Sequence, residues 1–215
     1  MQKKARSRYK SGIKQKIIEH ISSNIDLYIK VIIIFIIGIC IGIAIVNQLP
    51  ENSLQSIYEY INNSLNVLKE NTEISKIQML KSSLFKNVVI VLLIWFFGLT
   101  LLGGFVLYFL ILIIGITFGY TLSAIMTSLT FLQGILFFIT TLLFQNIIYI
   151  PAIIYLVVHG LKTQKSILNK QNTSIKYIVV KHSAYCIIVM ILLVIASLIE
   201  VFVSGNLIYY VIKYL

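Results

Sequence analysis

The chain has 215 residues, of which 59% are hydrophobic and only 12% are charged, and its mean hydropathy is +0.94. These values lie outside the range of ordinary soluble domains and predict an integral membrane protein. The formal net charge is +11, but the basic residues sit in short segments beside apolar runs. That distribution is typical of cytoplasmic membrane flanks and argues against nucleic acid as a partner.

Residues 1–30 hold eight basic side chains against two acidic ones. Isoleucines recur at every fourth position in this segment, at Ile13, Ile17, Ile21 and Ile25. The pattern predicts either a short amphipathic helix on an anionic inner leaflet or a frayed cytoplasmic tail. We therefore expect 1–30 to be a basic cytoplasmic tail and 31–215 to be the membrane domain.

The first uncharged run predicts a span over 31–49, too far from the N-terminus for a standard cleaved signal peptide. The next segment, 50–86, is expected to be external, because over 47–86 four lysines balance four glutamates and no cationic excess remains. Its apolar residues recur at steps of three and four, which predicts an amphipathic helix. This stripe comprises Leu54, Ile57, Ile61, Leu65 and Leu68. It favours the docking of a partner over packing against the outer leaflet.

No Lys, Arg, Asp or Glu occurs between Asn87 and Leu161. The length of this stretch fits three spans of about 25 residues with their turns. We place these spans over 87–106, 109–128 and 132–158, with the first turn at Gly103-Gly104 or just after it.

Two faces of small residues favour close helix packing. Gly38 and Gly42 share one face of the first span, and a second face on the third span comprises Gly115, Gly119 and Ser123. Small residues spaced by four let neighbouring helix backbones approach closely in a membrane.

A candidate polar motif lies inside the predicted bilayer. Gln145 and Asn146 fall near the middle of the predicted fourth span, and amides in hydrocarbon are costly unless they bond to another helix or to water. Pro151 should kink the same helix. Glu200, in the last turn of the fifth span, is expected to snorkel or to pair with a lysine at the start of the second span. Interhelical hydrogen bonding is the simpler interpretation, and a ligand or lipid site is the alternative.

Residues 162–181 carry five lysines and no acid, so this loop is expected in the cytoplasm. The fifth span follows over 182–203. One span plus three more returns the chain to its starting side, and both cationic segments agree on that side. The sequence therefore predicts an all-α bundle of five membrane spans, with the N-terminus inside and the C-terminus outside.

No catalytic set is visible in the sequence. The three histidines, His20, His159 and His182, lie at or outside the predicted span ends, and Asp26 is the only aspartate. No serine has a histidine at membrane depth to activate it, and no phosphate-binding glycine loop is present. We therefore expect the protein not to be an enzyme and to need no cofactor or metal.

Four motifs in order along the chain resemble a known family. They are Trp95-Phe96-Phe97-Gly98-Leu99-Thr100, Gly115-Ile116-Thr117-Phe118-Gly119-Tyr120, Gln145-Asn146 with Ile150-Pro151-Ala152, and Glu200-Val201-Phe202-Val203-Ser204. Together with the chain length, the five spans and the external segment, they resemble the stage II sporulation protein M family over nearly the whole chain. Gly205 stands where the family pattern has a proline.

The resemblance implies a function in endospore formation. It implies a non-catalytic scaffold that recruits the peptidoglycan-degrading stage II sporulation proteins D and P while the septal membrane migrates during forespore engulfment. It also implies a multi-pass protein of the bacterial inner membrane, in the septal or engulfing membrane, with lipid and these hydrolases as partners. The alternative is a transporter or permease subunit for a small molecule or lipid, although no internal repeat is visible.

Overall fold

The computed structural model describes residues 13–70, 73–169 and 174–204, and within these ranges the chain forms helices with short connections and no strand. Five helical segments are long and apolar enough to cross a membrane. They are Ile25–Asn47, Ile77–Gly98, Gly103–Ser128, Gln145–Leu168 and Ile175–Phe202. The predicted all-α architecture with five candidate spans is confirmed.

The helices follow one another with few residues between them. In chain order they are α1 (Ile13–Ser22), α2 (Ile25–Asn47), α3 (Glu51–Glu70), α4 (Glu73–Gly98), α5 (Gly103–Ser128), α6 (Phe131–Phe137), the π-helical segment η1 (Phe138–Leu143), α7 (Phe144–Leu168), α8 (Ile175–Ile199) and the π-helical segment η2 (Glu200–Ser204). Local capping sets several of these boundaries. The carbonyl oxygen of Pro50 accepts the first bonds of α3, and the Ser174 hydroxyl accepts from the backbone N–H of Tyr177 at the start of α8.

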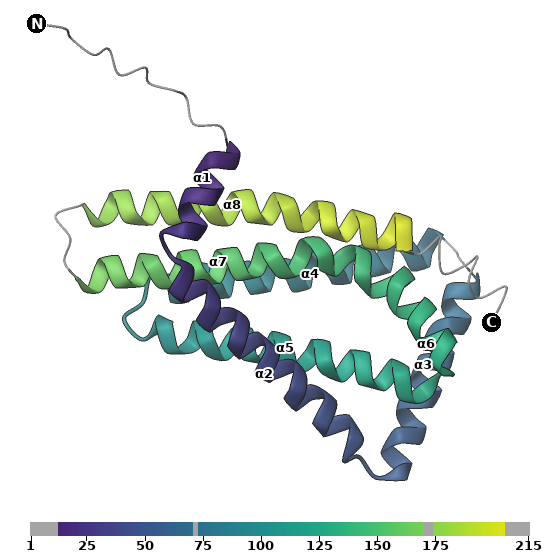
Figure 1. The fold of residues 1–215 in the computed structure, drawn as a ribbon. Helices are drawn as coiled ribbons and strands as arrows, with labels where there is room; N and C mark the ends of the chain where they lie inside the picture. The colour runs from purple at the N-terminus through teal and green to yellow at the C-terminus, as the bar shows by residue number, and fades with distance from the viewer. Residues whose placement is uncertain (1–12, 71–72, 170–173, 205–215) are drawn as a thin grey trace, which may run out of the picture.

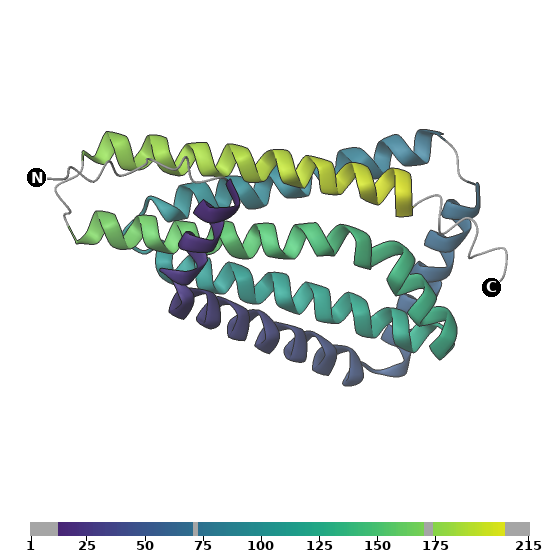
Figure 2. The same cartoon turned by 45° about the horizontal axis from the view of Figure 1, so that its top comes forward.

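Figure 1 shows α4, α5, α7 and α8 running side by side, with α2 crossing them at an incline and α3 lying across one end. We call that end the α3 end; it also holds α6 and the connection from α2 to α3. The opposite end, called here the α1 end, holds α1, the turn from α4 to α5, the C-terminal end of α7 and the start of α8 (Figures 1 and 2). The described parts of the two cationic segments, 1–30 and 162–181, therefore lie toward the same end of the bundle. This agrees with the count of spans, because four spans between the segments return the chain to its starting side. Which end faces the cytoplasm stays a prediction.

Helix α7 is the central span. It has the largest buried share of the five, 56%, and every residue from Leu156 to Leu161 is buried. Its Ile153 and Leu156 pack in a core with Ile94 of α4 and Leu193 of α8. The outer faces of the other spans are apolar and exposed, including Ile33, Ile36 and Ile37 of α2 and Ile187, Ile188 and Ile191 of α8. Helices that are apolar on both faces suit a lipid surround.

Helices α2 and α5 are in backbone contact at glycines. A Cβ atom on Gly38 would lie 2.5 Å from the carbonyl oxygen of Leu112 and 3.0 Å from the Cα of Gly115. A Cβ on Gly42 would meet the carbonyl oxygen of Ile116, and one on Gly119 would meet that of Ile39. No larger residue fits where two backbones approach this closely.

The turn between the second and third spans is earlier than the sequence suggested. The expected span over 87–106 is wrong at its end, because α4 ends at Gly98 and α5 begins at Gly103. The backbone N–H groups of Leu99 and Thr100 bond back to α4, and the Gln164 side chain of α7 donates to the carbonyl oxygen of Leu101, at 2.6 Å. The turn therefore lies before the Gly103-Gly104 pair, where the prediction placed it at or after that pair.

The segment expected as one span over 132–158 is divided differently. Thr130 begins α6, and its backbone N–H donates to the Gln133 side chain at 3.3 Å. The π-helical segment η1 then changes the direction of the chain, as Figure 2 shows, and α7 continues to Leu168. The predicted kink at Pro151 is not where the chain turns, because α7 passes through this proline and the bend is at η1.

The remaining boundaries differ by several residues. Helix α2 begins at Ile25, ahead of the expected 31, and α8 begins at Ile175, ahead of the expected 182. Much of the predicted loop over 162–181 is therefore helical. Lys162 and Lys165 lie in α7, and Lys176 and Lys181 lie in α8. All four are exposed, as long charged side chains near span ends usually are.

Candidate functional site

A hydrogen-bond network around Glu200 joins three helices toward the α3 end of the bundle. The Ser83 hydroxyl and the Gln145 amide nitrogen donate to the same carboxylate oxygen of Glu200, at 2.6 and 2.7 Å. Ser197, in the last turns of α8, lies 2.9 Å from Ser83 and accepts a 2.8 Å bond from the Asn87 amide nitrogen. These five residues form what we call the Glu200 network.

The network provides partners for polar groups that would be costly in an apolar surround. Asn87 is 2% exposed and Ser197 is fully buried, and the Ser197 hydroxyl also lies 3.0 Å from the carbonyl oxygen of Leu193. A carboxylate that accepts from two helices fixes their relative register. The arrangement is that of hydrogen bonding between helices.

The predicted polar motif is only partly assembled. Gln145 and Glu200 meet, while Pro151 lies on an exposed position of α7. Gln145 and Asn146 begin the fourth candidate span, so their expected place at its middle is wrong. Glu200 bonds to Ser83 and Gln145, and the charge of Lys86, one of the expected lysines, interacts with it. The Lys86 ammonium also lies 5.9 Å from the ring centre of Tyr149.

A cavity of about 420 Å³ lies beside the network, between α4, α5 and α7. Its walls are mostly apolar, and its polar members are Lys86, Thr117, Thr121, Gln145, Asn146 and Tyr149. The Tyr149 hydroxyl is buried and has no hydrogen-bond partner in the described part of the chain. An apolar lining of this kind suits an acyl chain better than a polar solute.

A second polar cluster was not anticipated from the sequence. All three histidines of the chain meet at the α1 end, contributed by α1, α7 and α8. The ring centres of His20 and His159 are 5.8 Å apart, and those of His159 and His182 are 5.4 Å apart with nearly parallel planes. A cavity of about 150 Å³ lies against them, with Lys162 and Lys181 in its lining. We call this cavity the histidine pocket.

The histidines differ in their partners. The Nδ1 of His20 lies 3.2 Å from the Tyr28 hydroxyl, and the Nδ1 of the fully buried His182 lies 3.5 Å from the hydroxyl of Thr163. His159 is 5% exposed, and neither of its ring nitrogens has a partner among the described residues. Burial and the neighbouring ammonium groups of Lys162 and Lys181 lower the pKa of His20 below its ordinary 6.5.

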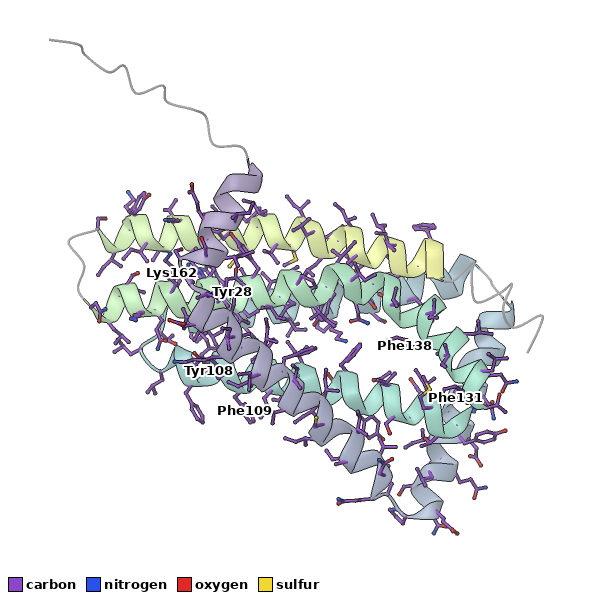
Figure 3. The ribbon with its side chains drawn as sticks, viewed as in Figure 1. Tyr28, Tyr108, Phe109, Phe131, Phe138 and Lys162 are labelled. Atoms are coloured by element: carbon purple, nitrogen blue, oxygen red, sulfur yellow. The ribbon has the colours of Figure 1, made fainter. Side chains whose placement is uncertain are left out.

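Figure 3 labels Lys162 of α7 and Tyr28 of α2, which lie near the point where α1 meets the bundle. The same view labels Phe131 and Phe138, which mark the α6–η1 segment at the α3 end. The two polar clusters therefore occupy opposite ends of the molecule. No group of three or more His, Cys, Asp or Glu side chains placed to hold a metal ion occurs in residues 13–70, 73–169 and 174–204.

The predicted partner-binding stripe lies on α3. Leu54, Ile57 and Ile61 are half-buried, and the side chains of Leu65 and Leu68 lie outside the described residues. Leu54 and Tyr58 face a small cavity shared with Thr127 and Ser128 at the end of α5, so the first turns of α3 rest on the bundle. Tyr58 is 50% exposed.

The predicted packing residues lie between α2 and α5. Gly38 and Gly42 face α5, Gly115 and Gly119 face α2, and Ser123, one turn further along α5, is buried.

Comparison with protein families gives one result. The family model described as Stage II sporulation protein M matches residues 31–205, from the first span to the end of the fifth. No curated protein and no solved structure gives a match. Because the matched region covers most of the chain and overlaps all five candidate spans, the protein belongs to the stage II sporulation protein M family, a family of sporulation membrane proteins.

Proposed function

We propose that this protein is a non-catalytic membrane scaffold that recruits peptidoglycan-degrading hydrolases, of the stage II sporulation D and P types, to the septal membrane during forespore engulfment. Membership of the sporulation family supports the process. The Glu200 network supports a structural role for these polar groups, since its side chains bond to one another between helices.

One observation carries the recruitment proposal. Helix α3, 20 residues long, lies across the α3 end of the bundle, outside the five candidate spans (Figure 1). A scaffold needs a surface that the bilayer does not cover, and an amphipathic helix lying across the span ends supplies one. Leu54 is half-buried against the end of α5, and Gln55, Tyr58 and Glu59 on the same helix are exposed. The half-buried Leu54, Ile57 and Ile61 then position the helix and contribute apolar contacts at its edge.

The proposal is tested by a matched pair of charge insertions. Ile61 is half-buried and Asn63, two residues further along α3, is exposed. In sporulating cells extracted with mild detergent, Ile61→Glu should lower hydrolase co-capture at least several-fold, while Asn63→Glu should leave it within about twofold. Both proteins should remain in the membrane, because the spans decide insertion.

A third variant separates a partner surface from a lipid surface. Tryptophan is favoured at a membrane interface, so a leaflet that covers the stripe should accept Ile61→Trp. A protein groove should reject the change of shape and lose co-capture. Normal co-capture by the Ile61→Glu protein would show that the stripe does not contact the hydrolases. The membrane spans would then be the contact.

A further inference from the structure

We propose that the histidine pocket at the α1 end binds a phosphate group. The pocket is formed where α1, α7 and α8 meet, and it lies at the opposite end of the bundle from α3. A phosphate there is therefore independent of hydrolase recruitment at α3. The proposal rests on unpartnered hydrogen-bonding groups, on charge and on size.

The pocket is lined by buried groups that lack partners. His159 is 95% buried, and both of its ring nitrogens, together with the Nε2 of His20, have no hydrogen-bond partner among the described residues. Buried polar atoms in native proteins are nearly always bonded to protein, water or a ligand. A neutral imidazole offers one N–H donor, so a ligand with several acceptor oxygens matches these rings.

The charges around the pocket are of one sign. Lys162 of α7 and Lys181 of α8 both line it, and its lining contains no aspartate or glutamate. The hydroxyl of Tyr177 adds a further donor from α8. Two ammonium groups combined with hydroxyl and imidazole donors form an environment for an anion with several oxygens.

The volume of the pocket argues against a whole nucleotide, and the ring geometry argues against a metal ion. About 150 Å³ is several times the ~30 Å³ share of one water, yet below the ~300 Å³ at which pockets for drug-sized molecules begin. A phosphate group fits this volume, whereas a whole nucleotide does not. The nearly parallel rings of His159 and His182 do not converge on one point, and the described residues contain no candidate metal cluster.

The source of the phosphate is either a soluble phosphate or a lipid headgroup, and two probes distinguish them. The full-length protein is placed in micelles of a maltoside detergent, which contains no phosphate, and inorganic phosphate is titrated to about 10 mM. In a second arm, phosphatidic acid is added to the micelles and inorganic phosphate is left out. Histidine-selective isotope labelling yields only three ring signals, and His159→Gln assigns one of them. A shift of the His159 signal in either arm supports the proposal. The arm in which the shift occurs identifies the source as soluble phosphate or as a lipid headgroup.

A charge-matched pair of variants tests the location. Lys162→Gln with Lys181→Gln removes the two pocket ammonium groups, and Lys165→Gln with Lys176→Gln removes two exposed ones from the same helices outside the pocket. The first pair should weaken the response at least tenfold, and the second should change it by less than about twofold. Unchanged Trp95 fluorescence shows that both proteins are folded.

Two results would overturn the proposal. One is a His159 signal that responds to neither inorganic phosphate nor phosphatidic acid in the wild-type protein. The other is equal weakening by both lysine pairs, which would show attraction to a basic surface without a pocket.

Discussion

At Gly42, a side chain would point at the carbonyl oxygen of Ile116 on the neighbouring helix α5. Gly42→Leu should therefore separate α2 from α5 and destabilise the protein by about 1–3 kcal/mol, the usual cost of overpacking. Ala44→Leu is the matched control, because Ala44 is exposed on the same helix and its enlargement faces lipid. Unfolding in a graded detergent mixture measures both. Equal stability of the two variants would show that the backbones do not touch at this position.

The bond between Gln145 and Glu200 is open to a double-mutant cycle. Measured side-chain hydrogen bonds between membrane helices average ~0.6 kcal/mol and reach ~1.7 kcal/mol. Because Glu200 accepts from Gln145 at 2.7 Å, Gln145→Leu and Glu200→Leu should couple by an amount in this range. Detergent unfolding of the wild type, both single variants and the double variant gives the coupling energy.

The control for that cycle pairs Glu200→Leu with Thr121→Val. Thr121 is exposed on α5, and its hydroxyl donates within its own helix to the carbonyl oxygen of Thr117. These two effects should add. Additive behaviour of Gln145 with Glu200 as well would mean that the network does not hold α7 against α8.

At the scale of elements, α1 is held to the bundle at its end by His20. The ring faces Tyr28 of α2, Tyr155, His159 and Lys162 of α7, and Lys181 of α8. Burial and the two ammonium groups lower the pKa of His20 below its ordinary 6.5. His20 thus stabilises the docked helix fully above that ordinary value, and the contribution is lost as the pH falls toward the lowered one.

Helix α1 should accordingly dissociate from the bundle in mild acid. Between about pH 7.5 and about pH 5.5, in buffer without phosphate, hydrogen exchange within α1 should rise several-fold after correction for intrinsic rates. His20→Phe keeps an aromatic ring but cannot titrate, so its exchange should not depend on pH in this range. An unchanged wild-type pattern would show that His20 does not hold α1 in place.

At the scale of the whole molecule, the orientation of the bundle can be tested directly. Single cysteines replace Asn63 on α3 and Lys165 near the end of α7, both exposed, with Cys40 and Cys186 removed. The lysine asymmetry predicts that an impermeant thiol reagent labels position 63 in intact protoplasts and position 165 only after lysis. The reverse labelling pattern would show that the bundle has the opposite orientation, with the histidine pocket on the outer side of the membrane.

Much of the architecture was predictable from the sequence because the bilayer imposes simple rules. The uncharged stretch from Asn87 to Leu161 indicates three spans through length alone. Charge asymmetry and parity assign both cationic segments to one side of the membrane, and the described parts of both lie at one end of the bundle. Hydropathy was a poor guide to boundaries because the turn at Leu99–Leu102 carries no charge. That turn bonds to Gln164, a residue over 60 positions away, and only the folded chain brings the two together.

The polar clusters separate what the sequence determined from what tertiary structure decided. Gln145, Glu200 and the three histidines are conspicuous in the sequence because polar groups in an apolar chain need partners. His159 and His182 lie almost equally far from the short connection between α7 and α8, so an antiparallel hairpin places them side by side. That signal was present, but the expected loop over 162–181 was too long to reveal it. His20 on α1 and Ser83 on α4 have no such relation to their partners, because those partners lie on helices that do not follow them directly in the chain. Their positions follow from side-chain packing between helices distant in the chain, which no local pattern encodes.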